Sequence, residues 1–222
     1  MEVTKLAGRC ATDGLTVLKD EERAELRALF IKEARKGAFL VSEGDVVGTR
    51  AAFCAHVQRE FGDSVLTVMD ALPYFRRKAG EQIGDRVPLA SLLLYATWSE
   101  NWVNVLIAVG TLRQGKPEET VDAYFAARPR FKDKVDHLQS LCGRALPERE
   151  RGWLMQVTKT RARYHHYVWK GVPALRLQKD LKGIAALMLR SDTMITGLLA
   201  FEYQEFDAPL IPVSLALFPP AR

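Results

Sequence analysis

The sequence predicts an all-α protein, a multi-helix bundle that ends in a proline-rich apolar tail. Three observations support this fold class. Apolar residues recur at helical spacing through most of the chain, alternating patterns typical of strands are few, and several prolines stand where the first turn of a helix is expected. The clearest element is a long helix predicted from Pro88 to about Leu112, whose apolar positions include Leu92, Tyr95 and Trp102.

Residues 1–62 are expected to form an N-terminal helical segment. Asp20 can cap a first helix, which ends at Gly37. After a connection, Thr49 can cap a second helix, which ends at Gly62. The segment is therefore predicted to be a pair of helices joined by a connection.

A helical bundle is expected over residues 63–206. Its first helix is predicted from about 64 to 78, with an interruption or bend near Pro73, and its last from 191 to 205. Helices of roughly ten to twenty residues are predicted after four further prolines, because proline is favoured in the first helical turn. These are Pro117, Pro129, Pro147 and Pro173.

The C-terminal tail, residues 207–222, combines four of the ten prolines with an apolar run from Pro209 to Phe218. Such a surface is costly to leave in water. The tail is therefore expected to pack on the body of the protein or on a second subunit.

Composition indicates a folded protein with a mildly basic charge. The chain is 48% hydrophobic and 27% charged, which argues against disorder, and its net charge of +5 with a pI near 9.1 permits a nucleic-acid partner. Cys10, Cys54 and Cys142 are too far apart for a zinc ribbon and odd in number, so we expect reduced thiols and a cytoplasmic location. The sequence shows no secretory signal, and its longest apolar stretches are too short and too polar to span a bilayer.

The segment 159–170 (KTRARYHHYVWK) concentrates the most chemistry, since it holds two of the four histidines among cations and aromatic residues. Histidine can transfer a proton near neutral pH, and arginine can bind a phosphate and stabilise the charge that builds on it. Cations and aromatic rings beside them can hold an RNA backbone and stack on bases, and no metal or other cofactor is required. The candidate catalytic residues are Arg161, His166 and His165, and the candidate nucleic-acid-binding residues are Lys159, Arg163, Tyr164, Tyr167 and Lys170.

Helix geometry limits which of these groups can meet. If the segment is helical, Arg161 and His165 lie within about 40° of one another, whereas His166 is turned about 100° further round. A helix that begins near this point, or a second subunit, would be needed to bring Arg161 and His166 together. The alternative is purely structural: a solvated helix end whose aromatic residues belong to the core.

The spacing from Arg161 to His166 fits the Arg-x4–6-His signature of the HEPN superfamily, and residues 64–205 resemble its helical bundle. The resemblance implies metal-independent endoribonuclease activity that leaves a 2′,3′-cyclic phosphate. It further implies that Arg161 and His166 pair across a homodimer interface, with His165 as a substitute, and that Glu100 and Asn101 lie on a supporting helix that faces the motif. Many active members carry a polar residue directly after the arginine, where this chain has Ala162.

The same resemblance implies an RNA substrate, a toxin or anti-phage defence role, and an antitoxin or other complex subunit as a partner. A non-catalytic helical interaction or regulatory protein is the main alternative. A second alternative is a DNA-binding regulator of helix-turn-helix type that reads DNA with Arg50, Gln58 and Arg59. Asp133 and His137 are too few to hold a metal, and no nucleotide-binding glycine loop or zinc-protease motif is present in the sequence.

Overall fold

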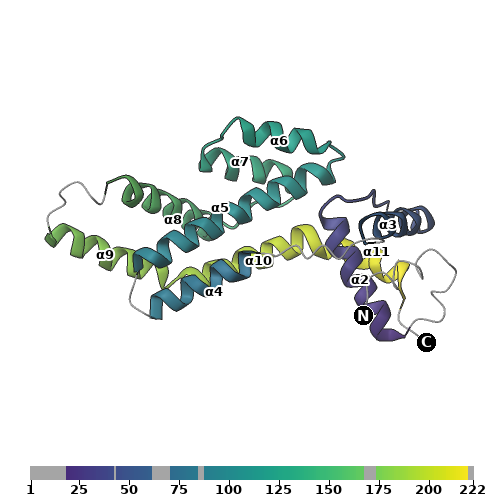
Figure 1. Cartoon of the computed structure of the whole chain (residues 1–222), viewed down its shortest axis with the longest axis horizontal. Coiled ribbons are helices and arrows are strands. Elements are labelled where there is room, and N and C mark those ends of the chain that lie inside the picture. Colours follow the sequence, from purple (N-terminus) through teal and green to yellow (C-terminus); the bar gives the residue numbers. More distant parts are fainter. Residues whose placement is uncertain (1–18, 43, 62–70, 85–87, 168–173, 220–222) are drawn as a thin grey trace. The chain divides into compact units, whose positions relative to one another are not determined.

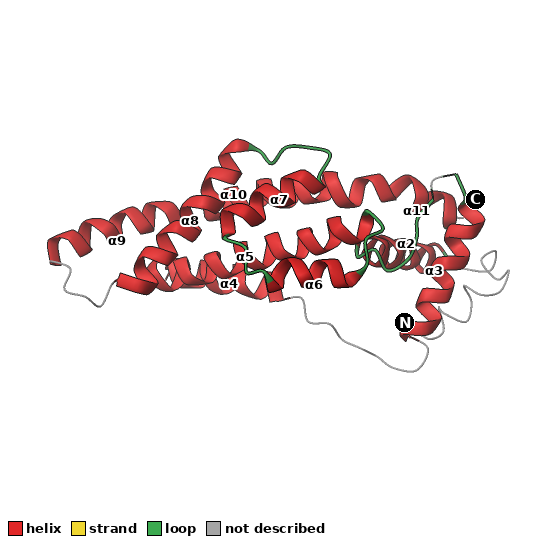
Figure 2. Cartoon of the chain, turned by 90° about the horizontal axis from the view of Figure 1, so that it is seen from above, coloured by secondary structure: helices red, strands yellow, loops and turns green. Residues whose placement is uncertain are grey.

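The computed structural model describes residues 19–42, 44–61, 71–84, 88–167 and 174–219. Every regular element in these ranges is helical, which confirms the all-α prediction, and Figure 2 shows them as helices joined by loops. The chain divides into two compact units. The terminal unit is built from the described parts of Met1–Val68, Thr111–Thr120 and Tyr203–Arg222, and the central unit from those of Met69–Gly110 and Val121–Glu202.

The helices follow the chain from purple to yellow in Figure 1. A π-helical turn (Tyr203–Asp207) and a 3-10 turn (Ala208–Leu210) separate the last two of them. The helix starts predicted near Pro88, Pro117, Pro129, Pro147 and Pro173 are confirmed. The helices are α2 Asp20–Arg35, α3 Val46–Phe61, α4 Ala71–Gly84, α5 Pro88–Arg113, α6 Glu118–Ala126, α7 Phe131–Leu141, α8 Glu148–Tyr167, α9 Ala174–Met188, α10 Ser191–Glu202 and α11 Ile211–Leu217.

Helix α3 begins earlier than its predicted cap at Thr49. The carboxylate of Asp45 accepts a hydrogen bond from the backbone N–H of Gly48 at 2.8 Å and so caps the helix from outside. The Thr49 side chain is buried, and its hydroxyl donates to the carbonyl of Ser42 at 3.1 Å. Thr49 therefore anchors the preceding connection, and the capping role falls to a residue four positions earlier.

Helix α4 is described from Ala71 to Gly84. It continues through Pro73 without a break and extends six residues past the predicted end at Lys78. Pro73 lies in the first turn, where its missing N–H has no intrahelical partner to lose. The N-terminal part of the predicted helix, residues 64–70, lies outside the described residues.

An aromatic cluster forms the core of the terminal unit. The ring of Phe30 on α2 lies 5.5 Å from that of Phe53 on α3, and Phe53 lies 5.7 Å from Phe218. Helix α11 contacts both α2 and α3. The guanidinium of Arg27 donates to the carbonyl of Phe218 at 2.6 Å. The apolar C-terminal run therefore completes the core that the N-terminal helices begin.

Helix α5 is the central element of the other unit. Its large side chains Tyr95, Trp98 and Trp102 are almost fully buried, and so are smaller residues on its other sides. One stripe of α5, which includes Leu93 and Val105, stays exposed, so the helix is buried on most of its circumference and open along one side. In Figure 1, α4 and α10 run along one side of α5, while α6 and α7 lie together on another.

Candidate functional site

Three helices of the central unit bring their charged side chains together around Glu100. Glu100 lies on α5, and its two carboxylate oxygens accept from different partners. Arg161 on α8 donates to one oxygen at 3.2 Å, and Lys134 on α7 donates to the other at 3.1 Å. We call these three residues the Glu100 cluster. The HEPN resemblance implied that the helix carrying Glu100 faces the Arg161 segment, and Glu100 and Arg161 are in contact in the structure.

The three side chains of the Glu100 cluster differ in their exposure. The side chain of Lys134 is only 10% exposed, whereas those of Arg161 and Glu100 are 34% and 37% exposed. The Lys134 ammonium also lies 5.7 Å from the centre of the Phe125 ring. One carboxylate faces two cations, so the cluster carries a net positive charge. A guanidinium has five N–H donors, and at this exposure Arg161 can offer some of them to an anion.

Helix α8 is continuous from Glu148 to Tyr167, so no helix begins within the Arg–His segment. Positions 161 and 165 therefore share a helix face, and position 166 lies about 140° around the axis from position 161. Within one chain, position 165 is therefore better placed than position 166 to act together with Arg161. The side chains of His165, His166 and Tyr167, and the whole of Lys170, lie outside the described part of the structure.

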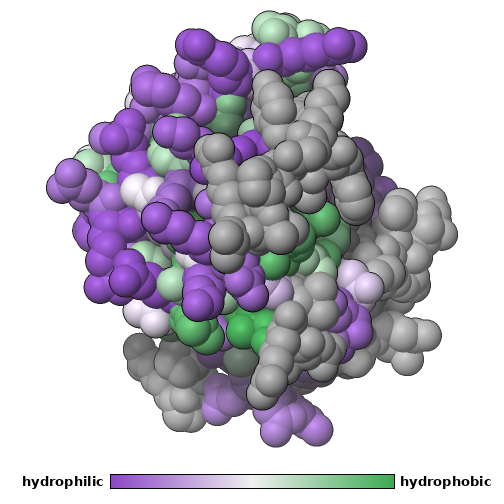
Figure 3. All heavy atoms as spheres, turned by 90° about the vertical axis from the view of Figure 1, so that its left-hand side faces the viewer, coloured by the Kyte–Doolittle hydropathy of each residue, from purple (hydrophilic) through white to green (hydrophobic). Residues whose placement is uncertain are grey.

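The other predicted residues lie around this end of α8. Lys159 is exposed, and Asn101 is half-buried next to Glu100 on α5. Arg163 donates to Asp180 on α9 at 3.3 Å, and its guanidinium lies 5.8 Å from the centre of the Tyr164 ring. On the face toward which α8 ends, hydrophilic side chains cover much of the described surface, with smaller apolar patches among them (Figure 3).

Lys134 is a member of the cluster that was not among the predicted site residues. The signal was in the register: Lys134 precedes Val135 and lies four residues before Leu138, and both of these are fully buried. A lysine on the buried face of a helix requires a partner for its charge, and here Glu100 supplies it.

The role of α3 as a DNA reader stays a prediction. One face of α3 carries Thr49, Phe53 and His56 into the core of the terminal unit, whereas Gln58 is exposed. Arg59 is exposed and paired with Glu60 at 3.0 Å. The connection between α2 and α3, residues 36–45, is also longer than the tight turn of a helix-turn-helix.

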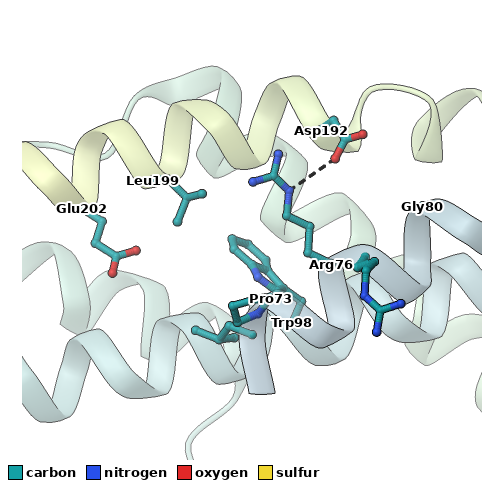
Figure 4. A pocket seen from close by; sticks show the side chains of 9 residues that line it. Pro73, Arg76, Gly80, Trp98, Asp192, Leu199 and Glu202 are labelled. Carbon is teal, nitrogen blue, oxygen red and sulfur yellow. Dashed lines mark hydrogen bonds and ion pairs between the residues drawn. The ribbon is translucent and has the colours of Figure 1, made fainter. Parts of the chain in front are cut away.

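A pocket of about 410 Å³ lies between α4, α5 and α10 in the central unit (Figure 4). The indole of Trp98 forms a wall, and Arg76 reaches over it to Asp192, with its Nε 3.4 Å from the carboxylate. At the other end lies the buried carboxylate of Glu202, which accepts from the indole N–H of Trp102 at 2.5 Å. The lining is completed by Leu72, Pro73, Arg77, Gly80 and Leu199.

Two buried hydroxyl groups lie near the Asp192 end of this pocket. Tyr95 precedes Trp98 by one turn of α5, and Ser191 is the neighbour of Asp192. Both side chains are fully buried, and neither hydroxyl has a hydrogen-bond partner among the described residues. Burial raises the pKa of Tyr95 to about 12, and the nearby Asp192 carboxylate adds to the rise while Arg76 opposes it. No local pattern in the sequence signals this pocket, since its residues come from three distant helices.

Comparison with known proteins identified no relative: no family model, no curated protein and no solved structure matches the chain. Within the described residues, no group of three or more His, Cys, Asp or Glu side chains could hold a metal ion. No single described helix is long and apolar enough to cross a membrane, although the bent pair Gln178–Met188 and Ser191–Leu217 meets the length and composition criteria.

Proposed function

We propose that the surface formed by α5, α7 and α8 binds RNA and cleaves it without a metal. The observation that carries the proposal is the ion pair between Arg161 and Glu100, 3.2 Å long and about one-third exposed. The ion pair fixes the position of the Arg161 guanidinium. Arg161 lies on α8, and the same continuous helix carries two histidines one turn further on. A fixed cation next to a proton-transfer group is the minimum that metal-free phosphoryl transfer on RNA requires.

The chemistry follows from these groups. A neutral imidazole at position 165 or 166 takes the proton of a ribose 2′-hydroxyl, and the oxygen attacks the adjacent phosphorus. The bond from phosphorus to the 5′-oxygen breaks, and that oxygen takes a proton from an imidazolium or from water. The products are a 2′,3′-cyclic phosphate and a free 5′-hydroxyl. Arg161 stabilises the negative charge that grows on the phosphate oxygens.

The two histidines correspond to two arrangements of the site. Position 165 shares the face of Arg161, so His165 would act with the arginine of its own chain. Position 166 faces elsewhere, so His166 would act with the Arg161 of a second copy in a symmetric dimer, as the HEPN resemblance implies. The structure describes one chain, and the experiment below distinguishes the two arrangements.

The test is cleavage of an end-labelled RNA pool in EDTA. Wild type is compared with the variants Arg161→Ala, His165→Ala and His166→Ala. Arg149→Ala is the matched control, because it removes an exposed arginine from the first turn of the same helix. We expect wild type to produce fragments ending in cyclic phosphate. Arg161→Ala and at least one histidine variant should lose roughly 100-fold or more of the rate, and the control should keep it.

The histidine that matters assigns the arrangement. Loss with His165→Ala indicates a site within one chain. Loss with His166→Ala, together with restored cleavage when Arg161→Ala and His166→Ala chains are mixed, indicates a shared dimer site. RNA that stays intact with folded wild type, or cleavage that survives Arg161→Ala, would contradict the proposal.

A further inference from the structure

A groove lies in the terminal unit, between the end of α2 with the connection that follows it, the end of α5, and the residues at the start of α11. All of its lining residues belong to this unit. Its volume is about 370 Å³, which falls in the range of small-ligand sites and can hold a few residues of a peptide. A ligand bound here would not require the proposed nuclease activity, because the Glu100 cluster belongs to the other unit.

Two glycines with a left-handed backbone let the helix ends approach each other at this groove. Gly37 follows α2 with a φ of +71°, and a Cβ there would lie 2.6 Å from the Cβ of Leu112. Gly115 follows α5 with a φ of +72°, and its N–H donates to the carbonyl of Leu112 at 2.9 Å. Because neither glycine carries a side chain, the groove stays open between the two helix ends.

Residues 39–41 form a wall of the groove that offers unpaired backbone groups. The segment is anchored before this wall, where the N–H of Ala38 donates to the carbonyl of Glu33 at 3.3 Å. It is anchored again after the wall, where the N–H of Ser42 donates to the Thr49 hydroxyl at 3.0 Å. Between these anchors, no backbone group of residues 39–41 has a hydrogen bond with a described residue. A peptide in an extended conformation can pair with such groups, as it does when it adds to the edge of a sheet.

Apolar side chains form the floor and one edge of the groove. Leu210 and Val213 are buried and line the floor. Leu40 at the edge is 80% exposed, the highest fraction among the large apolar side chains that the structure describes. A single exposed leucine is ordinary on a protein surface, but this one stands beside a groove and unpaired backbone groups. A ligand that brings an apolar side chain into the groove would cover Leu40 and gain from its burial.

The charged lining residues that the structure describes are both cations, Arg113 and Lys116. Arg113 uses one amino group for the carbonyls of residues 205–206, at 3.3 and 3.4 Å, which leaves its other N–H donors for a ligand. Lys116 is exposed and forms no ion pair with a described residue. The nearby Asp207 carboxylate lies 3.5 Å from Arg35 and does not line the groove. The lining therefore carries a positive charge and attracts an anionic group.

We propose that the groove binds a short acidic peptide of a partner protein in an extended conformation. The peptide main chain pairs with residues 39–41, an apolar side chain contacts Leu40 and the floor, and a carboxylate meets the two cations. Side chains of an extended peptide point to alternate sides, so one peptide can present apolar residues to the floor and acidic residues to the cations. A fatty acid also joins an apolar chain to a carboxylate, but it would leave the backbone groups of residues 39–41 unused.

Fluorescence polarisation with labelled hexapeptides and the full chain tests the inference. The probe is DVDLDV with blocked ends, which alternates acidic and apolar residues. KVKLKV keeps the apolar residues and reverses the charge, whereas DSDSDS keeps the charge and removes the apolar side chains. A fourth peptide has the probe sequence with N-methyl groups on alternate backbone amides, which removes hydrogen-bond donors. We expect the probe to bind at least about tenfold more tightly than each of the other three.

Two variants, each with a matched control, locate the binding site. Lys116→Glu should weaken binding of the probe by about tenfold or more, because like charges repel. Leu40→Ser should weaken it by about threefold or more, because the apolar contact is lost. Lys32→Glu and Val47→Ser are the controls and should leave the affinity unchanged. Lys32 lies about 160° around α2 from Ala34, which lines the groove, and Val47 is 74% exposed outside the lining.

All four substitutions replace exposed side chains, so circular dichroism should show the wild-type fold for each variant. No binding of the probe at submillimolar protein concentration, or equal binding of the probe and KVKLKV, would overturn the proposal. An affinity unchanged in either Lys116→Glu or Leu40→Ser would overturn it as well. Saturable binding of decanoate without binding of the probe would assign the groove to a lipid chain instead.

Discussion

The two units of the chain each contain a carboxylate that is shared between two basic side chains. In the terminal unit, Glu33 on α2 lies 3.3 Å from the imidazole of His56 and 2.9 Å from the Lys36 ammonium. In the central unit, Glu100 lies between Lys134 and Arg161 at similar distances. The Glu33 side chain is 4% exposed, whereas that of Glu100 is 37% exposed. The same grouping of charges can therefore have two different roles, according to its exposure.

Burial determines the role of each group. A carboxylate removed from water needs its partners in order to be tolerated, so the Glu33 group is expected to contribute to stability. A half-exposed carboxylate keeps much of its hydration, so the ion pair between Glu100 and Arg161 contributes little to stability. Its effect is to fix where the Arg161 guanidinium lies, which matters for a ligand that meets it.

The largest effect is expected from removing the buried carboxylate. Glu33→Ala leaves His56 buried without this partner and should lower the free energy of unfolding by about 3 kcal/mol. Urea denaturation followed by circular dichroism measures the change. Glu25→Ala removes an exposed carboxylate from the same helix and should stay within about 0.5 kcal/mol of wild type. Equal effects of the two variants would show that burial does not distinguish them.

A smaller loss is expected at Gly37, which ends α2 with a φ of +71°. A Cβ at this position would lie 2.6 Å from the Cβ of Leu112. Gly37→Ala should therefore lower the free energy of unfolding by about 2 kcal/mol, from the left-handed backbone and the close contact together.

Gly183 lies inside α9 with open space around it, so Gly183→Ala should stabilise the central unit by about 0.5 kcal/mol. The same denaturation assay measures both, and a stabilising Gly37→Ala would contradict the packing described here.

The smallest effect is expected at Asp207, a carboxyl of the terminal unit whose pKa burial raises, against the lowering influence of Arg35 and Arg113. A raised pKa means that the folded state binds the proton more readily than the unfolded state, so stability is lost as pH rises through the folded pKa. Asp207→Asn should gain less than about 1 kcal/mol at pH 7, and the gain should fade as pH falls through that pKa. Denaturation curves at pH 7 and pH 4 test this, and a gain that is larger at pH 4 would contradict it.

Local patterns in the sequence predicted where the helices lie better than they predicted which helices pack together. Prolines located the starts of α5 to α9, because a first-turn proline is a local signal. The predicted start of α3 was wrong, because Asp45 and Thr49 are both good caps, and α4 continues past its predicted end at Lys78. The association of the C-terminal run with α2 and α3 depends on long-range packing, which no local pattern records.

The candidate site was predictable only in part. Arg161 and Glu100 were both singled out, but the sequence alone could not show that Lys134 completes the group around Glu100. The pocket was missed altogether, because Arg76, Trp98 and Glu202 come from three helices and each one looks ordinary in its local sequence. Convergence of single residues from distant segments has no periodic signature.

We infer that the Glu100 cluster holds Arg161 for a ligand and not for the fold. The most direct test measures stability and RNA cleavage on the same Arg161→Ala preparation, with Arg149→Ala as the control. We expect a free energy of unfolding within about 1 kcal/mol of wild type, together with the loss of cleavage in EDTA. A loss of stability as large as that of Glu33→Ala, with RNA cleavage unchanged, would contradict it.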